Sequence, residues 1–259
     1  MTEATAVDSS TVVIEARNLC KDRVSNFLRK HYRVLDGLNL QVTEGTTFGL
    51  VGPNGAGKTT TIKLLLGLLR PDGGTAQVLG KAAGDALALQ QIGYLPETPY
   101  FYSHLTGREF LDFSGNLFGL DKSTIKSRSQ KLLERVSLQK AADERTGKYS
   151  KGMLQRLGIA QALINEPKIL FLDEPMSGLD PLGRMDMRKI LLELKAEGRT
   201  IFFNSHLLPD VALLCDRVGI LCNGKLVAES SMADITSTGN VQELEEYFLQ
   251  HTRSAVPSP

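Results

Sequence analysis

Gly52-Pro53-Asn54-Gly55-Ala56-Gly57-Lys58-Thr59 decides the fold of this chain, because it fits the pattern G-x-x-x-x-G-K-[ST]. An apolar run over residues 46–51 precedes this stretch, and apolar residues at helical spacing follow it over residues 60–69. A strand, a glycine-rich loop and a helix in this order are the context that a phosphate-binding loop needs. We therefore expect the chain to bind a nucleoside triphosphate.

The chemistry of this loop assigns a role to each of its residue types. Glycines let backbone N–H groups close around phosphate oxygens, and the start of the helix adds partial positive charge. We expect Lys58 to reach the β- and γ-phosphates and the Thr59 hydroxyl to ligate Mg²⁺. The residues expected to hold the phosphates are Gly52, Pro53, Asn54, Gly55, Ala56, Gly57, Lys58, Thr59 and Thr60.

The overall composition is that of an ordinary globular protein. Of the 259 residues, 42% are hydrophobic and 23% charged, and the formal net charge is +1. This balance gives no reason to expect a nucleic-acid partner, which usually selects a strongly basic domain. Cys20, Cys215 and Cys222 are odd in number and form no C-x-x-C pair, which argues against a disulfide framework or a zinc site. The apolar runs are too short to cross a membrane, so any membrane contact is expected through a partner.

The order of patterns predicts an α/β fold with a P-loop NTPase core. Strands alternate with helices from residue 168 onward, which indicates a mostly parallel sheet, and we expect an antiparallel β portion near the N-terminus. The span of about 96–165 reads as helix and loop throughout, with a capping box at Thr106 and Glu109, so it is expected to form an inserted helical subdomain. Residues 11–250 form one unit in this interpretation, and residues 251–259 a disordered tail.

Two acids follow a second apolar run. In Ile169-Leu170-Phe171-Leu172-Asp173-Glu174-Pro175, four strand residues lead into the carboxylates. The strand is expected to place Asp173 beside the loop, where it holds Mg²⁺ directly or through water. Glu174 then lies at the strand tip, where a general base would polarise the attacking water.

A second helix start has the features of an anion site. In Tyr149-Ser150-Lys151-Gly152-Met153-Leu154-Gln155-Arg156, Ser150 is a good N-cap and Gly152 permits close approach. Two phosphate-facing helix starts about ninety residues apart in one chain suggest that two chains share their nucleotides.

Together these motifs resemble the nucleotide-binding subunit of ATP-binding-cassette (ABC) transporters over roughly residues 12–250. The stretch from Ser150 to Arg156 is similar to the signature helix of that family in a variant form, and Ser177-Gly178-Leu179-Asp180 is similar to its D-loop. His206 matches the switch histidine. Gly93-Tyr94-Leu95-Pro96-Glu97 resembles the Q-loop, with Glu97 where most members have Gln. This variant is similar to the branch that pairs with ABC-2-type membrane subunits, which are mostly exporters.

The resemblance implies a mechanism that uses two cassettes. ATP and Mg²⁺ would be the cofactors, and a second cassette, identical or related, would face the first head to tail. Ser150 and Gly152 of one cassette would then contact the γ-phosphate held by the other, with Asp180 nearby. Thr59, Asp173 and Glu97 would serve Mg²⁺, Glu174 would be the base, and His206 would support the γ-phosphate. The subunit would lie at the cytoplasmic face of the membrane, attached through an ABC-2-type permease.

The family usually offers an aromatic residue near its first strand to stack on adenine, and this chain has Arg23 at the matching position. Arg23 can stack its guanidinium plane, or Phe27 or Tyr32 can substitute for the aromatic ring. A solvated basic loop, or a loop that contacts lipid head groups, is the alternative interpretation. The consecutive aromatic residues Tyr100, Phe101 and Tyr102 cannot all face one core. One or two are expected to pack inside the helical insert and at least one to line a groove for the membrane subunit, and local packing of all three is the alternative interpretation.

A rival from another class is a soluble cassette that acts on ribosomes or DNA rather than in transport. Such proteins usually carry two cassettes, long coiled-coil inserts or basic extensions. This sequence has a single cassette, no heptad run and balanced charge, which favours the transporter subunit.

Overall fold

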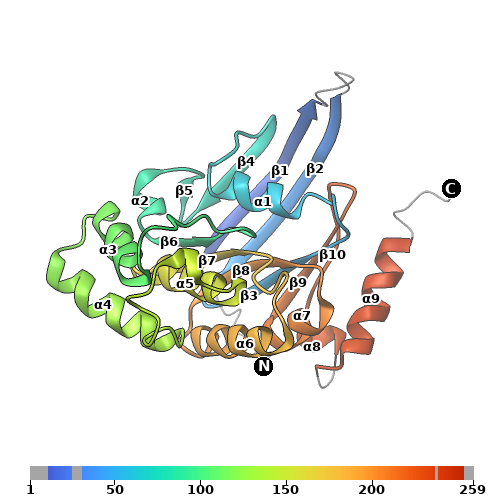
Figure 1. Cartoon of the computed structure of the whole chain (residues 1–259). Coiled ribbons are helices and arrows are strands. Elements are labelled where there is room, and N and C mark those ends of the chain that lie inside the picture. The colour runs from blue at the N-terminus through green and yellow to red at the C-terminus, as the bar shows by residue number, and fades with distance from the viewer. Residues whose placement is uncertain (1–10, 25–30, 237–238, 254–259) are drawn as a thin grey trace, which may run out of the picture.

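Two β-sheets and the helices around them form the framework of the chain (Figure 1). The computed structural model describes residues 11–24, 31–236 and 239–253. Within these ranges, none of the helices has both the length and the apolar content needed to cross a membrane.

The first sheet is antiparallel and four-stranded, in the order β2-β1-β4-β5. Its strands are β1 (Val12–Val24), β2 (His31–Thr43), β4 (Gly73–Val78) and β5 (Lys81–Ala82). β1 is longer than the strand predicted over residues 12–17, because the chain passes through a register shift near Asn18, which has a φ of 47°, and then pairs with β2 again. Arg23 therefore belongs to a strand rather than to a basic loop.

The second sheet is six-stranded, in the order β10-β9-β3-β8-β7-β6, and all of its pairings except β9–β10 are parallel. Its strands are β3 (Thr47–Val51), β6 (Ile92–Leu95), β7 (Ile169–Asp173), β8 (Thr200–Ser205), β9 (Arg217–Cys222) and β10 (Lys225–Ser231). Val51 pairs with Ser205, and Asp173 pairs with Asn204, so β3, β7 and β8 end at one edge. The predicted α/β fold, with its antiparallel portion, is confirmed.

The two faces of the parallel sheet contribute to two hydrophobic cores. Phe171 and Phe202 point into a core shared with the antiparallel sheet and α1 (Lys58–Leu65), whereas the adjacent Leu172 and Phe203 point into the other. This alternation is the period of two that a strand requires. The other helices outside the insert are α2 (Ala86–Leu89), α6 (Pro181–Ala196), α7 (Leu208–Leu214), α8 (Met232–Ile235) and α9 (Val241–Arg253).

α1 ends at Leu65, four residues earlier than the pattern over residues 60–69 predicts. The helix ends in a Schellman motif at Gly67, which has a φ of +70°. The Gly67 amide donates to the Leu64 carbonyl, and the Leu68 amide donates to the Lys63 carbonyl. A Cβ atom at Gly67 would lie only 2.4 Å from the Cα atom of Gly84. Position 67 therefore requires glycine both for its backbone angle and for the close approach of Gly84.

The span between β6 and β7 holds α3 (Gly107–Leu117), α4 (Lys122–Arg135), a short 3-10 helix (Thr146–Lys148) and α5 (Lys151–Leu163). The capping box at the start of α3 is confirmed, since the Thr106 hydroxyl accepts from the Glu109 amide and the Glu109 carboxylate accepts from the Thr106 amide. Figure 1 shows α3 and α4 projecting from the side of the molecule opposite α9.

The end of α9 corrects one expectation. Residues 251–253 of the predicted disordered tail are helical, and the Thr252 hydroxyl donates to the Phe248 carbonyl at 2.8 Å. Thr252 is also buried, so packing extends the helix into the polar stretch. Residues 254–259 of the predicted tail lie outside the described residues.

Gly93 in β6 gives a stability prediction. A Cβ atom at Gly93 would lie 2.1 Å from the Ala162 carbonyl oxygen on α5, so Gly93→Ala must push α5 away from the sheet. We expect the free energy of unfolding to fall by about 2–3 kcal/mol, measured by urea denaturation.

Gly73→Ala is the matched control for this substitution. A Cβ atom at Gly73 would meet its nearest neighbour, the Cys20 Cβ atom, at an ordinary 3.4 Å. Equal denaturation midpoints for the two variants would contradict the close packing of α5 on β6.

Candidate nucleotide-binding site

The glycine-rich loop joins β3 to α1 and presents the start of that helix. Gly57 is the N-cap of α1 with a φ of 110°, and none of the described side chains caps the helix. The amide groups of the first turn are therefore available to an anion. A Cβ atom on Gly57 would lie 2.7 Å from Leu35 and 3.0 Å from the Val34 carbonyl oxygen, so this position requires glycine on grounds of space as well as backbone angle.

Lys58 is a nearly buried cation beneath the loop. Its ammonium group donates to the carbonyl oxygens of Gly52 at 2.8 Å and Pro53 at 3.3 Å, and it lies 3.7 Å from a Glu174 oxygen. Burial lowers the pKa of Lys58, while the carboxylates of Glu174 and Asp173 oppose that shift. A buried ammonium with mainly carbonyl partners is well suited to bind phosphate oxygens, which accept charge-assisted hydrogen bonds.

Asp173 and Thr59 provide oxygen atoms side by side. The Thr59 hydroxyl donates to an Asp173 carboxylate oxygen at 2.9 Å, and the buried Asn204 amide donates to the same oxygen at 2.7 Å. Hydroxyl and carboxylate oxygens are the ligands that Mg²⁺ takes in proteins, usually together with water and substrate phosphates. These residues therefore fit a magnesium ion beside the loop.

Glu174 is held in an unusual backbone conformation. It has a φ of 51°, and its amide donates to the side-chain oxygen of Asn204 at 2.7 Å. Its carboxylate lies 2.8 Å from the His206 Nδ1 atom, so the glutamate is fixed at both ends. The turn of the backbone aims the buried carboxylate toward Lys58 and the cavity rather than along the strand.

A cavity of about 640 Å³ brings most of the predicted site residues together. It is lined by Arg23, Tyr32, Val34, Asn54, Gly55, Ala56, Gly57, Lys58, Thr59, Thr60, Glu97, Glu174, Ser177 and His206. Arg23 and Tyr32, two of the candidates for base stacking, both line it, whereas Phe27 lies outside the described residues. Gly52 and Pro53 act beneath the cavity, through the carbonyl groups that hold Lys58.

Ser150, Gly152 and Asp180 lie elsewhere on the same chain. They line a second hollow of about 360 Å³, which shares no residue with the cavity above the loop. Ser150 caps α5 by accepting from the Met153 amide, and Asp180 caps α6 by accepting from the Gly183 amide. One chain therefore carries two separate parts of the predicted site.

Asn204 is the site residue that the sequence reasoning did not assign. It is fully buried at the end of β8 and bonds both acids, donating to Asp173 and accepting from Glu174. A polar residue within the apolar strand Ile201-Phe202-Phe203-Asn204 was the available signal.

A glycine-rich loop at the start of a helix, a buried lysine and two acids at the end of an adjoining strand define a P-loop ATPase. The family model described as ABC transporter matches residues 35–177. An uncharacterized ABC transporter ATP-binding protein of Nostoc sp. is 47% identical over 250 residues, which cover 92% of this chain and 75% of the relative. The bacitracin transport ATP-binding protein BcrA of Bacillus licheniformis is 43% identical over 198 residues, which cover 75% of this chain and 64% of BcrA.

Solved structures of ABC transporter cassettes match the fold of this chain. An ATP-binding subunit of an ABC transporter has a TM-score of 0.77 at 31% identity, covering 92% of this chain and 98% of that one. A dimeric cassette in a post-hydrolysis state with ADP and Pi has a TM-score of 0.76 at 22% identity, covering 85% of this chain and 98% of that one. At this identity the match supports the fold alone. The chain belongs to the ABC transporter family and is its ATP-binding, ATP-hydrolysing cassette.

The position of Asn204 between the two acids predicts a kinetic defect. Asn204→Ala removes the donor to Asp173 and the acceptor for the Glu174 amide, so both carboxylates lose their fixed positions. We expect the steady-state ATPase kcat to fall by about 10- to 100-fold, with a higher Mg²⁺ requirement.

The neighbouring Ser205→Ala is the control, because the Ser205 hydroxyl accepts from Leu207 and has no contact with either acid among the described interactions. If Asn204→Ala kept the kcat and the Mg²⁺ dependence of the wild type, Asp173 and Glu174 would hold their positions without the Asn204 amide.

Proposed function

We propose that the chain binds Mg²⁺·ATP in the 640 Å³ cavity and acts as one of two cassettes that drive a separate membrane-spanning permease. The observation that carries this proposal is the division of the phosphate-binding features between two hollows of one chain. Ser150 and Gly152 have no access to the P-loop of their own chain through a common cavity. A second cassette placed head to tail brings its Ser150 and Gly152 to this P-loop.

Thr59 and Asp173 would hold Mg²⁺ in this proposal, and Glu97, which lines the same cavity, would assist. Mg²⁺, when bound, neutralises charge on the phosphate oxygens. Burial lowers the pKa of Lys58, and the exposed Glu97 carboxylate opposes that shift after those of Glu174 and Asp173. Glu97 also lines the cavity with Lys58, which supports a place for it near the same phosphates.

Glu174 accepts the proton of the attacking water in this proposal. Its carboxylate is buried, faces the cavity and is oriented by His206 at 2.8 Å. A positioned carboxylate contributes on the order of 10²- to 10⁴-fold as a general base. His206 is half exposed and lines the same cavity, so it also supports the γ-phosphate.

Tyr32 and Arg23 take the base of the nucleotide. They lie opposite each other on β2 and β1, and both line the cavity with the P-loop. A phenol ring and a guanidinium plane each stack on a base without reading its hydrogen-bonding edge.

The permease contact is proposed at a groove of about 350 Å³, lined in part by Leu66, Tyr94, Pro96 and Tyr100. The Phe101 ring packs against Phe110 with centroids 4.8 Å apart, whereas Tyr100 is 84% exposed at the rim. An exposed ring at the mouth of an apolar groove favours a helical segment of a partner protein. The cassette then lies at the cytoplasmic face of the membrane.

An ABC-2-type partner and transport out of the cell are proposed from the motifs and the relatives. The Nod factor export ATP-binding protein I of Ralstonia nicotianae is 41% identical over 207 residues, which cover 78% of this chain and 64% of the relative. Glu97 and the Tyr-Ser-Lys-Gly-Met variant at residues 149–153 resemble the same branch.

Removal of the general base should trap the paired state. Glu174→Gln is expected to keep ATP binding and to lower turnover by at least about 100-fold, because an amide does not accept the proton. The variant should then elute as a dimer in gel filtration with ATP. Lys58→Ala, which loses the buried cation, should lose ATP binding and remain a monomer. A Glu174→Gln sample that binds ATP and stays monomeric would oppose the two-cassette proposal.

Mixing two inactive variants tests whether the signature helix acts on the partner's nucleotide. Ser150→Ala should abolish hydrolysis with little change in the ATP affinity of the monomer, because Ser150 lies outside its own cavity. A mixture with Lys58→Ala should recover activity, since each mixed dimer contains one intact site. Each variant alone at the same total concentration is the control, and a mixture no more active than either would argue against action in trans.

A further inference from the structure

Tyr32 and Arg23 lie in a part of the antiparallel sheet that has little packing of its own. Tyr32 is 49% exposed and Arg23 is also exposed, so burial does little to fix either side chain. The two residues are directly opposite each other in the pairing of β1 with β2. Their place at the cavity therefore depends on how these strand ends are held together.

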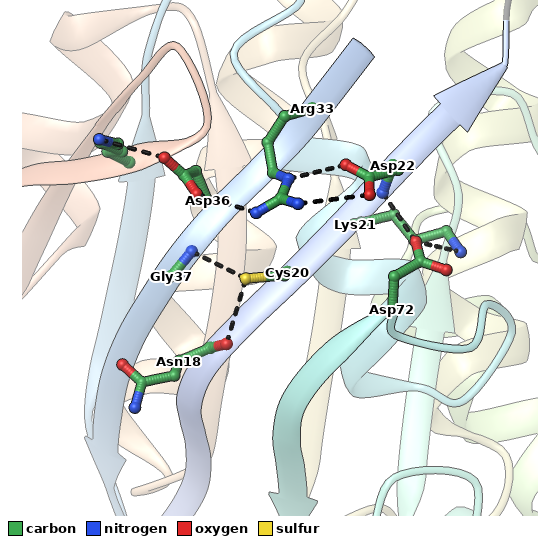
Figure 2. Close-up of polar contacts among 9 residues, drawn as sticks. Asn18, Cys20, Lys21, Asp22, Arg33, Asp36, Gly37 and Asp72 are labelled. Carbon is green, nitrogen blue, oxygen red and sulfur yellow. Dashed lines mark hydrogen bonds and ion pairs between the residues drawn. The ribbon is translucent and has the colours of Figure 1, made fainter. Parts of the chain in front are cut away.

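The next cross-strand pair, Asp22 and Arg33, joins the two strands on the opposite face. The Arg33 guanidinium donates to both carboxylate oxygens of Asp22, from Nε at 2.7 Å and from Nη2 at 3.4 Å (Figure 2). A bidentate contact of this kind fixes the orientation of the guanidinium group as well as its distance from the carboxylate. It holds the strands in the register that turns Arg23 and Tyr32 toward the cavity.

Arg33 also connects this strand pair to the P-loop. Its Nη1 atom donates to Asp36 at 3.1 Å, and the second Asp36 oxygen lies 3.1 Å from the Lys225 ammonium (Figure 2 shows the Asp36 contact). The backbone amide of Asp36 donates to the Gly224 carbonyl, and the amide of Gly224 donates to the Ala56 carbonyl in the P-loop. A short series of contacts thus runs from Arg33 to the phosphate end of the cavity.

The other side of β1 is fixed independently. The Asp22 amide donates to Asp72 at 2.7 Å, and the Lys21 ammonium lies 3.0 Å from the same carboxylate oxygen. These contacts hold β1 against the turn before β4 but do not reach β2. Beside Arg23, β2 is held by Arg33 and the backbone pairing. Further along the strands, the Gly37 amide on β2 also donates to the Cys20 Sγ atom on β1 at 3.2 Å (Figure 2).

We propose that Arg33 is a positioning residue for nucleotide binding, because its ion pairs with Asp22 and Asp36 hold Tyr32 and Arg23 as the base-side wall of the cavity at a fixed place relative to the P-loop. This inference rests on the proposed binding of ATP in that cavity. Arg33 lies on the far face of the strand from Tyr32, so it acts on the nucleotide only through its neighbours.

Steady-state kinetics with two ligands tests the proposal. Arg33→Ala should raise the KM for ATP by about three- to fivefold, the scale of exposed ion pairs, and leave kcat within about twofold. Inorganic tripolyphosphate, which has no base, should inhibit the variant and the wild type with the same inhibition constant. A variant with a disturbed P-loop or a destabilised fold would instead bind both ATP and tripolyphosphate more weakly.

Further variants separate the ion pair from general effects. Asp22→Asn keeps the shape of the side chain and should raise the KM for ATP in the same way. Arg33→Lys cannot make a bidentate contact, so its KM for ATP should lie between those of the wild type and Arg33→Ala. Tyr32→Ala should make the effect of the Arg33 substitution smaller, because one of the two residues that Arg33 holds in place is already lost. Arg17→Ala is the matched control, since Arg17 is an exposed arginine of β1 that pairs with Glu15 away from the cavity.

An unchanged KM for ATP in both Arg33→Ala and Asp22→Asn would overturn the proposal. An inhibition constant for tripolyphosphate that rises as much as the KM for ATP would overturn it as well. Full additivity of the Tyr32 and Arg33 substitutions would also overturn it. Failure of the underlying function gives a different result, because the wild-type protein would then bind neither ATP nor tripolyphosphate.

Discussion

The parallel pairing of β3, β7 and β8 is the constraint on which the site depends. This pairing ends all three strands at one edge of the sheet, so the P-loop leaves β3 beside the acids of β7 and the polar end of β8. Asn204 then joins the two acids through one buried amide. The left-handed backbone of Glu174 costs on the order of 1–3 kcal/mol, and its hydrogen bonds to Asn204 offset part of that cost.

The segment after Glu174 connects the two hollows of the chain. Ser177 lines the cavity above the P-loop, whereas Gly178 lines the hollow that contains Ser150 and Asp180. A Cβ atom on Gly178 would meet the Lys151 ammonium at 2.0 Å, so the side chain of this first residue of α5 lies directly against the turn. The backbone between Glu174 and Gly178 thus joins the cavity above the P-loop to the hollow that contains Ser150.

Local motifs made the nucleotide site predictable, and tertiary contacts account for what the sequence did not reveal. The P-loop and the acids after β7 could be identified because each combines a short pattern with its own strand or helix. Asn204 acts on residues thirty positions away, so no local pattern assigns its role. The early end of α1 is a different case, because Gly67 caps the helix locally and a glycine within a helical pattern is itself a signal for such an end. The choice between Arg23 and Tyr32 could not be made from spacing either. β1 continues past a register shift and pairs Arg23 with Tyr32 on β2, so both residues line the cavity.

The claim that the site is completed by a second cassette is tested most directly by a crystal structure of Glu174→Gln with ATP and Mg²⁺. The account predicts two copies head to tail, with the triphosphate on the P-loop of one chain and the Ser150 hydroxyl of the other within hydrogen-bond distance of its γ-phosphate. Tyr32 and Arg23 should lie against the base. A nucleotide enclosed by one chain alone, or a dimer in which Ser150 faces solvent, would contradict the account.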